Sequence, residues 1–224
     1  MMELQSLSPA QREAILDKQG HEPCPGVAIE FQRSLGATGH GPQLQATIYR
    51  PCERPSSARP APALLAFHGG GYQNGDPNGC GALAKTLALG VTTVSASYRL
   101  AAPDRPTFPG LLDDARHAWR WVQDHASELA IDPERVAVSG ESAGAYVAAH
   151  LAVNSPYIPF RKDERRPAAF IAQWGPLDLV ARWFDLGGNP GAEGVMLGAH
   201  SAAPPARVTL QYTLLETQQV PIVP

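Results

Sequence analysis

The stretch Arg135–Gly144 reads RVAVSGESAG, an apolar run that passes through a glycine-flanked serine into an alanine-rich segment. The run 135–139 predicts a strand buried on both faces, and residues 143–153 predict a helix. A G-x-S-x-G sequence between a strand and a helix holds its serine on a strained turn at the helix N-terminus, where the helix dipole favours developing negative charge. Ser142 is therefore the predicted nucleophile of an acyl-transfer site.

A glycine run follows directly on an earlier apolar segment, residues 63–67, and reads HGGG at positions 68–71. Three consecutive glycines cost backbone entropy and add no packing, so a folded domain keeps them where side chains must be absent. The amides of Gly70, Gly71 and Ala143 are the predicted donors to the oxyanion of a tetrahedral intermediate.

The remaining chain alternates short apolar runs with helical periodicity. Predicted strands lie at 26–31, 44–49, 63–67, 91–97, 135–139, 168–173 and 208–215, and predicted helices at 11–18, 79–89, 109–127 and 143–153. The first two strands flank a glycine-rich turn and favour a hairpin. The alternation between residues 63 and 174 predicts an α/β fold with a doubly wound, mostly parallel sheet and right-handed crossovers.

Composition limits the other classes of function. The 224 residues, 44% of them apolar, predict a single domain over 1–224. A formal net charge of −3 gives no basic field for nucleic acid. No stretch has the apolar length of a membrane span, and Met1–Gln5 lacks the start of a secretory signal, so we expect a cytoplasmic protein.

Two further features are expected to carry no chemistry. Cys24, Cys52 and Cys80 are widely spaced and include no C-x-x-C pair, which argues against both a disulfide framework and a zinc ribbon. The charged run 161–166 contains two acids among its basic residues and favours a solvated loop.

Shorter motifs extend the two glycine-containing ones: YRLA at 98–101, FP at 108–109 and GPLDL at 175–179. Together with HGGG and GESAG they resemble the hormone-sensitive-lipase-like esterases of the α/β-hydrolase fold, in particular the acetyl-xylan/feruloyl esterase-like branch. The resemblance covers roughly residues 60–200. It implies an α/β-hydrolase fold, no metal or organic cofactor, a small N-terminal cap formed by residues 1–28, and these site residues: Ser142 as nucleophile, Gly70, Gly71 and Ala143 as oxyanion donors, and Tyr72 in the acyl pocket.

The family order places an acid and then a histidine after the serine, on later loops. Eighty-two residues follow Ser142, which is short for two more strand–loop units, so we expect a C-terminally shortened fold. The strand 208–215 should lie beside 168–173 and bring Gln219 or Val220 to the place of the acid. Glu216 and His200 are weak candidates for acid and base. A truncated or frameshifted esterase, a degenerate hydrolase fold and a base of unknown position all remain open.

The other histidines are expected to be structural. His68 should orient its loop, because the base in this fold comes from a loop late in the chain. His117, His125 and His150 lie on predicted helices and should be surface or packing residues. Asp178 matches the family's loop toward the cap and is also expected to be structural.

The leading functional hypothesis is a serine carboxylic-ester hydrolase that acts on small-molecule, short-chain acyl esters through an acyl-enzyme. An arylformamidase-like amidase is the alternative within the same fold. A non-enzymatic hydrolase fold that binds a carbonyl ligand or a partner is the alternative of another class. The sequence leaves the oligomeric state open.

Overall fold

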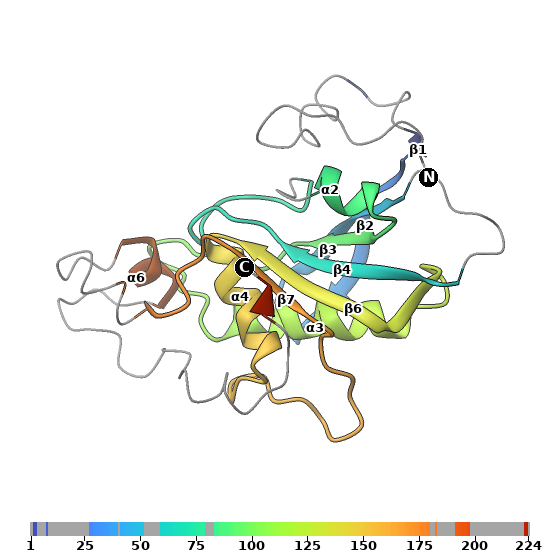
Figure 1. The fold of residues 1–224 in the computed structure, drawn as a ribbon. Coiled ribbons are helices and arrows are strands. Elements are labelled where there is room, and N and C mark those ends of the chain that lie inside the picture. The colour runs from blue at the N-terminus through green and yellow to red at the C-terminus, as the bar shows by residue number, and fades with distance from the viewer. Residues whose placement is uncertain are drawn as a thin grey trace.

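The computed structural model describes residues 2–3, 8, 27–39, 41–51, 59–78, 83–179, 182, 191–197 and 222–223. These residues contain one mixed sheet of eight strands in the order β1-β2-β3-β5-β4-β6-β7-β8 (Figure 1). The strands are β1 (Met2–Glu3), β2 (Ala28–Ala37), β3 (Gln43–Arg50), β4 (Ala61–Phe67), β5 (Thr92–Ala96), β6 (Ile131–Glu141), β7 (Phe170–Gln173) and β8 (Ile222–Val223). The helices are α2 (Leu83–Ala88), α3 (Gly110–Asp124), α4 (Ala143–Ala152) and α6 (Gly191–Leu197).

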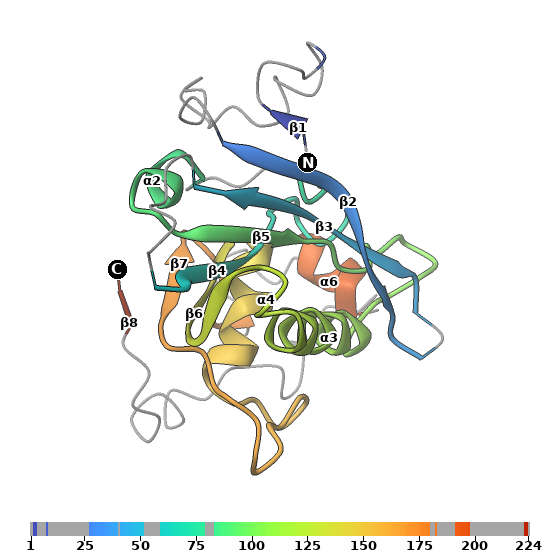
Figure 2. The same ribbon diagram turned by 90° about the vertical axis from the view of Figure 1, so that its right-hand side faces the viewer.

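The sheet divides into an antiparallel and a parallel part. Neighbouring strands pair in parallel from β5 through β4, β6 and β7 to β8, and antiparallel from β1 to β5. Helix α2 covers one face, and α3 and α4 cover the other (Figure 2). Every residue of β5 and nearly every residue of β4 is buried, as expected of strands covered on both faces. The predicted doubly wound, mostly parallel α/β fold is confirmed.

Most predicted elements are present, with shifted ends. The predicted hairpin is confirmed as β2 and β3, whose strands are longer than predicted. The predicted helix 109–127 is α3, and its apolar positions Leu111, Ala115, Trp119 and Val122 are fully buried.

Strand β6 starts earlier than predicted, because residues predicted as a turn belong to it. Ile131 pairs with Ala61, whereas Val136 pairs with Ala63, so four residues of β6 lie opposite a single residue of β4. Such a bulge lets the chain hold a proline-containing stretch inside a ladder. The turn signal at Asp132–Glu134 therefore marked an irregularity within a strand.

At the other edge of the sheet, Ile222 and Val223 of β8 pair with Phe170 and Ile171 of β7. Several predictions lie outside the described residues: the strand 208–215, Gln219 and Val220, the helix 11–18 and the three cysteines. Most of the segment 1–28 expected to form a cap also lies outside the described residues, so the cap stays a prediction. Within that segment, Met2 and Glu3 pair with Ile29 and Ala28.

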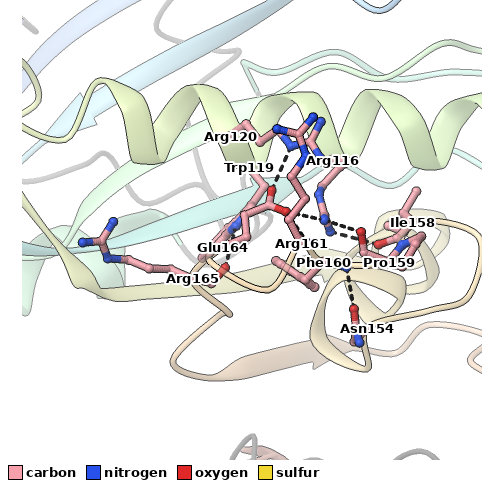
Figure 3. Close-up of polar contacts among 10 residues, drawn as sticks. All are labelled: Arg116, Trp119, Arg120, Asn154, Ile158, Pro159, Phe160, Arg161, Glu164 and Arg165. Atoms are coloured by element: carbon pink, nitrogen blue, oxygen red, sulfur yellow. Dashed lines mark hydrogen bonds and ion pairs between the residues drawn. The ribbon is translucent and has the colours of Figure 1, made fainter.

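The expectation of a solvated loop at 161–166 is wrong for one of its residues. Glu164 accepts hydrogen bonds from Arg116 Nη2 at 2.6 Å and Arg120 Nε at 2.8 Å, both on α3 (Figure 3). Burial alone raises the pKa of Glu164, but the hydrogen bonds from Arg120 and from the Arg161 amide lower it below its ordinary value. The remainder of the run is largely exposed.

None of the helices within the described ranges has the length and apolar character of a membrane span.

Candidate active site

Ser142 occupies the turn between β6 and α4 in a strained backbone conformation. Its φ is 51° and its ψ is −118°. Such angles cost a non-glycine residue about 1–3 kcal/mol and persist only where the surroundings impose them. The Ser142 amide donates to Gln173 O at 2.9 Å, and the Ser142 carbonyl accepts from the Ala145 amide at 3.0 Å. The carboxyl end of β7 and the first turn of α4 thus fix the serine from both sides.

Close backbone approaches explain the glycines around this turn. A Cβ on Gly140 would lie 2.0 Å from Gly144 O, and a Cβ on Gly144 would lie 2.2 Å from Phe67 O. A Cβ on Gly175 would lie 2.2 Å from Ala145 Cβ. Real Cβ atoms never approach that closely, so side chains at these positions are excluded where β4, β6 and α4 cross.

The glycine loop after β4 runs beside the serine. A Cβ on Gly69 would lie 3.3 Å from Ser142 Cβ. Gly70 and Gly71 have φ values of +120° and +58°, which favour glycine. The Gly70 carbonyl accepts the amides of Gln73 and Asn74 at 3.2 and 3.0 Å, and this closes a tight turn.

A cavity of about 250 Å³ opens beside Ser142. It is lined by Gly71, Tyr72, Ser142, Ala143, Trp174, Gly175, Pro176, Arg182 and Glu193. The cavity thus brings together four of the predicted site residues: Ser142, Gly71, Ala143 and Tyr72. Gly70 lies in the adjoining turn but is not part of this lining.

Of the five other lining residues, Gly175 and Pro176 belong to the GPLDL motif, and Trp174, Arg182 and Glu193 were not predicted as site residues. Trp174 directly follows the predicted strand 168–173, so its place at the carboxyl end of a parallel strand was a usable signal. It is 70% exposed and has a positive φ of 39°. Arg182 and Glu193 lie on later segments, and no motif marks them.

His68 is buried against the aromatic core and not in the cavity lining. Its ring stacks on Tyr98 with 4.4 Å between centroids, and its Nδ1 lies 2.7 Å from Gly69 O. Because a carbonyl oxygen only accepts, Nδ1 carries the proton. Burial lowers the pKa of His68 and so favours the neutral form of the ring. These contacts fit the expected role in orienting the glycine loop.

The histidines of α3 and α4 pack as predicted. His117 Nε2 lies 2.5 Å from Leu35 O, and His125 stacks on Trp121 with 4.2 Å between centroids. His150 is 1% exposed, its Nδ1 lies 2.7 Å from Ser155 Oγ, and burial lowers its pKa to about 3. None of the three is among the described residues that line the cavity.

Other candidates have no described role in the cavity. His200 and Glu216 lie outside the described residues. The carbonyl of Asp178 accepts the Arg182 amide at 3.0 Å, a contact that fits its expected structural role. Among the described residues, no group of three or more histidine, cysteine or acidic side chains is arranged to hold a metal ion.

The sequence also matches a family of known fold. The family model described as alpha/beta hydrolase fold matches residues 64–182, a span that includes the glycine loop and the turn at Ser142. The chain belongs to this α/β-hydrolase family. Together with the esterase relatives described next, this match confirms the predicted resemblance to esterases of this fold, while the acetyl-xylan/feruloyl branch stays a prediction.

Individual relatives are esterases by name. Esterase LipI of Mycobacterium tuberculosis is 38% identical over 147 residues, which are 65% of this chain and 43% of that protein. Ethyl acetate hydrolase of Pseudomonas putida is 41% identical over 117 residues, 51% of this chain and 36% of that protein. The solved structure of a bacterial heroin esterase matches with a TM-score of 0.56 at 30% identity, over 69% of this chain and 46% of that chain. The chain thus matches less than half the length of each relative.

Proposed function

We propose that this protein is a serine carboxylic-ester hydrolase that acts on short-chain acyl esters through an acyl-enzyme. The observation that carries the proposal is the strained conformation of Ser142 at the N-terminus of α4. Ser142 lies beside a cavity that Gly71 and Ala143 also line. Strain of this kind is kept where it serves a site, and a serine on a strand-to-helix turn is the nucleophile arrangement of this fold.

In the proposed reaction, Ser142 Oγ forms a bond to the ester carbonyl carbon as its proton leaves. The carbonyl oxygen becomes an oxyanion, and the amides of Gly71 and Ala143, with that of Gly70, donate to it. Collapse of this intermediate breaks the bond to the alcohol, which takes up a proton and departs. Water then attacks the acyl-enzyme and releases the acid.

The group that accepts the Ser142 proton is not assigned. Among the described residues that line the cavity there is no histidine, and the packed rings of His68 and His150 already have structural partners. The C-terminal shortening expected from the sequence, and the places of acid and base, stay predictions.

One observation favours esters over amides, and a second favours short acyl groups. The named relatives are an esterase and an ethyl acetate hydrolase. The cavity, at about 250 Å³, is smaller than the roughly 300–1,000 Å³ that holds drug-sized ligands. We also propose that the chain works as one cytoplasmic domain on small molecules and not on nucleic acid, in keeping with its net charge of −3.

The test is covalent labelling by a fluorophosphonate. The intact protein should be labelled at Ser142, and Ser142→Ala should abolish labelling while the melting temperature stays near that of the wild type. Hydrolysis of p-nitrophenyl acetate should exceed that of an N-formyl arylamine. Labelling of another residue in Ser142→Ala would refute the assignment of the nucleophile, and faster cleavage of the arylamide would favour the amidase.

A further inference from the structure

One wall of the cavity beside Ser142 carries opposite charges. Arg182 and Glu193 both line it, and Arg182 Nε lies 3.7 Å from Glu193 Oε1. The Glu193 side chain is only 15% exposed, while that of Arg182 is 47% exposed. The other described lining residues carry no formal charge. A substrate group that enters the cavity therefore meets one cation and one anion.

An alkyl group, an ion and a neutral hydroxyl would differ in how favourably they bind between these two charges. An alkyl group displaces water from both charges without replacing its hydrogen bonds, which is unfavourable for polar groups left unsatisfied. An ion of either sign is attracted by one member of the pair and repelled by the other, and it must also lose its own hydration. A neutral hydroxyl both donates and accepts, so it can satisfy both members at once.

The spacing of the pair suits a single hydroxyl. Two polar atoms 3.7 Å apart can each lie about 2.8 Å from one oxygen placed between them. That oxygen would donate to Glu193 and accept from Arg182. Since the pair's own separation exceeds that of a good hydrogen bond, the inserted group gains contacts without breaking a strong one.

We infer that the ester attacked by Ser142 carries a hydroxyl on the group that enters this cavity, held between Arg182 and Glu193. This inference rests on the proposed function, because it concerns the substrate of the same serine. Arg182 and Glu193 thereby act as specificity-determining residues. A site built to hydrogen-bond a substrate hydroxyl rejects the analogue that lacks it far more strongly than an apolar pocket rejects a missing methylene.

Matched phosphonates test the inference without needing turnover. The probes are methyl p-nitrophenyl phosphonates that carry either propyl or 2-hydroxyethyl on phosphorus, two groups of nearly equal size. Ser142 Oγ forms a bond to phosphorus, p-nitrophenolate leaves, and the serine proton passes to solvent. Labelling rates are divided by the rate of each probe with hydroxide. The wild type should react at least about tenfold faster with the hydroxyethyl probe, a conservative bound for this kind of discrimination.

Variants of the pair should redirect this preference. In Arg182→Met/Glu193→Met the propyl probe should become the faster one. Glu193→Gln leaves a cation and should raise the relative rate of a carboxymethyl probe, whereas Arg182→Gln leaves an anion and should raise that of a 2-aminoethyl probe. The matched control is Glu134→Met/Arg165→Met, which removes an exposed ion pair outside the cavity and should leave the wild-type ratio unchanged.

The outcomes distinguish a failure of the hydroxyl inference from a failure of the proposed esterase function. Equal or faster reaction of the propyl probe with the wild type, at Ser142, overturns the inference and leaves the proposed function standing. A hydroxyethyl preference that survives in the double methionine variant also overturns it. If no probe and no fluorophosphonate labels Ser142, the proposed function fails and the inference fails with it. Should the double variant not fold, as judged by its melting transition, the two glutamine variants decide.

Discussion

The turn at Ser142 and the loop 155–168, at the two ends of α4, are stabilised in different ways. At the turn, main-chain atoms of β4, β6 and α4 approach so closely that Gly140 and Gly144 have no room for a side chain. In the loop, Arg116 donates to the carbonyls of Ile158 and Pro159, and Glu164 joins Arg116 to Arg120 (Figure 3). The N-terminal end of α4 therefore requires glycines that leave room for close main-chain packing. The loop after its C-terminal end is held by hydrogen bonds and ion pairs of long charged side chains.

The difference decides what a substitution does at each end. A side chain added at the turn has nowhere to go, because backbone cannot move aside without unpacking the sheet. A side chain removed from the loop leaves a buried charge without its partner. Four predictions test this contrast. Three compare matched variants, and the fourth compares a variant with the wild type.

The largest effect is expected for Gly144→Ala. The new Cβ would lie 2.2 Å from Phe67 O, so the crossing of β4 and α4 must open. We expect a loss of about 4 kcal/mol or more in the free energy of unfolding, the range of severe core disruption. Gly90→Ala is the control, because a Cβ there meets nothing within 4 Å, so only the strain of the positive φ of Gly90, +74°, is added. Urea denaturation measures both, and similar losses for the two would contradict the steric account.

Gly71→Val should lower the reaction rate much more than its effect on stability explains. Its Cβ meets only Ala192 Cβ at 3.2 Å, but Gly71 lines the cavity and its amide is a proposed oxyanion donor. Valine keeps the amide but disfavours the positive φ of +58° at this position, so the amide should turn away from the oxyanion. Loss of one such donor costs about 10²–10³ in rate, and esterase turnover or phosphonate labelling should fall by that factor. Gly39→Val has a similar φ, +51°, and open space around it. Its loss of stability should match that of Gly71→Val while its rate stays normal. Equal rates in the two variants would show that the glycine at 71 is only structural.

Glu164→Ala should be the costliest change in the loop. Arg116 is 6% exposed, so removal of Glu164 leaves a buried guanidinium without its carboxylate. The expected loss is about 3 kcal/mol in the free energy of unfolding. Glu134→Ala removes the partner of Arg165, where both side chains are exposed, and should cost less than about 1 kcal/mol. A Glu134→Ala loss as large as that of Glu164→Ala would mean that burial does not govern these pairs.

The smallest effect concerns His150, which lies in the last turn of α4 and contacts Ser155 at the start of the loop. Burial lowers the pKa of His150 to about 3, whereas an unfolded histidine has a pKa near 6.5. Between these values the unfolded chain binds a proton that the folded chain does not. Stability is therefore complete above about pH 6.5 and falls as the pH drops toward 3.

In His150→Asn this part of the pH dependence should vanish, which would make the fall shallower by up to about 1.4 kcal/mol for each pH unit. Urea denaturation at pH 7, 5.5 and 4.5 compares the two proteins. If the stabilities of the two proteins fell in parallel as the pH dropped, the folded chain would protonate His150 as readily as the unfolded chain does.

The same contrast explains which features could be predicted from sequence. The Ser142 turn was predictable because glycines at 140 and 144 are local signals of close backbone approach. The role of Glu164 was not, since its partners Arg116 and Arg120 lie 48 and 44 residues earlier. Arg182 and Glu193 were missed for a similar reason, because the cavity wall forms only when separate segments meet. The bulge in β6 was missed because a turn signal and a strand irregularity use the same residues.

Strand β2 has a consequence for how copies of this chain meet. Its pairing with β3 shifts register twice, between Glu30 and Arg33 and between Ser34 and Gly36, and Gln32 has a positive φ of 53°. Arg33 is paired with Glu30 at 3.1 Å and with Glu128 at 2.6 Å. Strand β1 pairs with β2 only at Ala28 and Ile29. A foreign strand that approached the rest of β2 would find a kinked ladder with charged side chains and not a flat template for hydrogen bonding. Among the described residues, the irregular part of β2 that follows Ile29 therefore disfavours edge-to-edge pairing on the antiparallel side of the sheet.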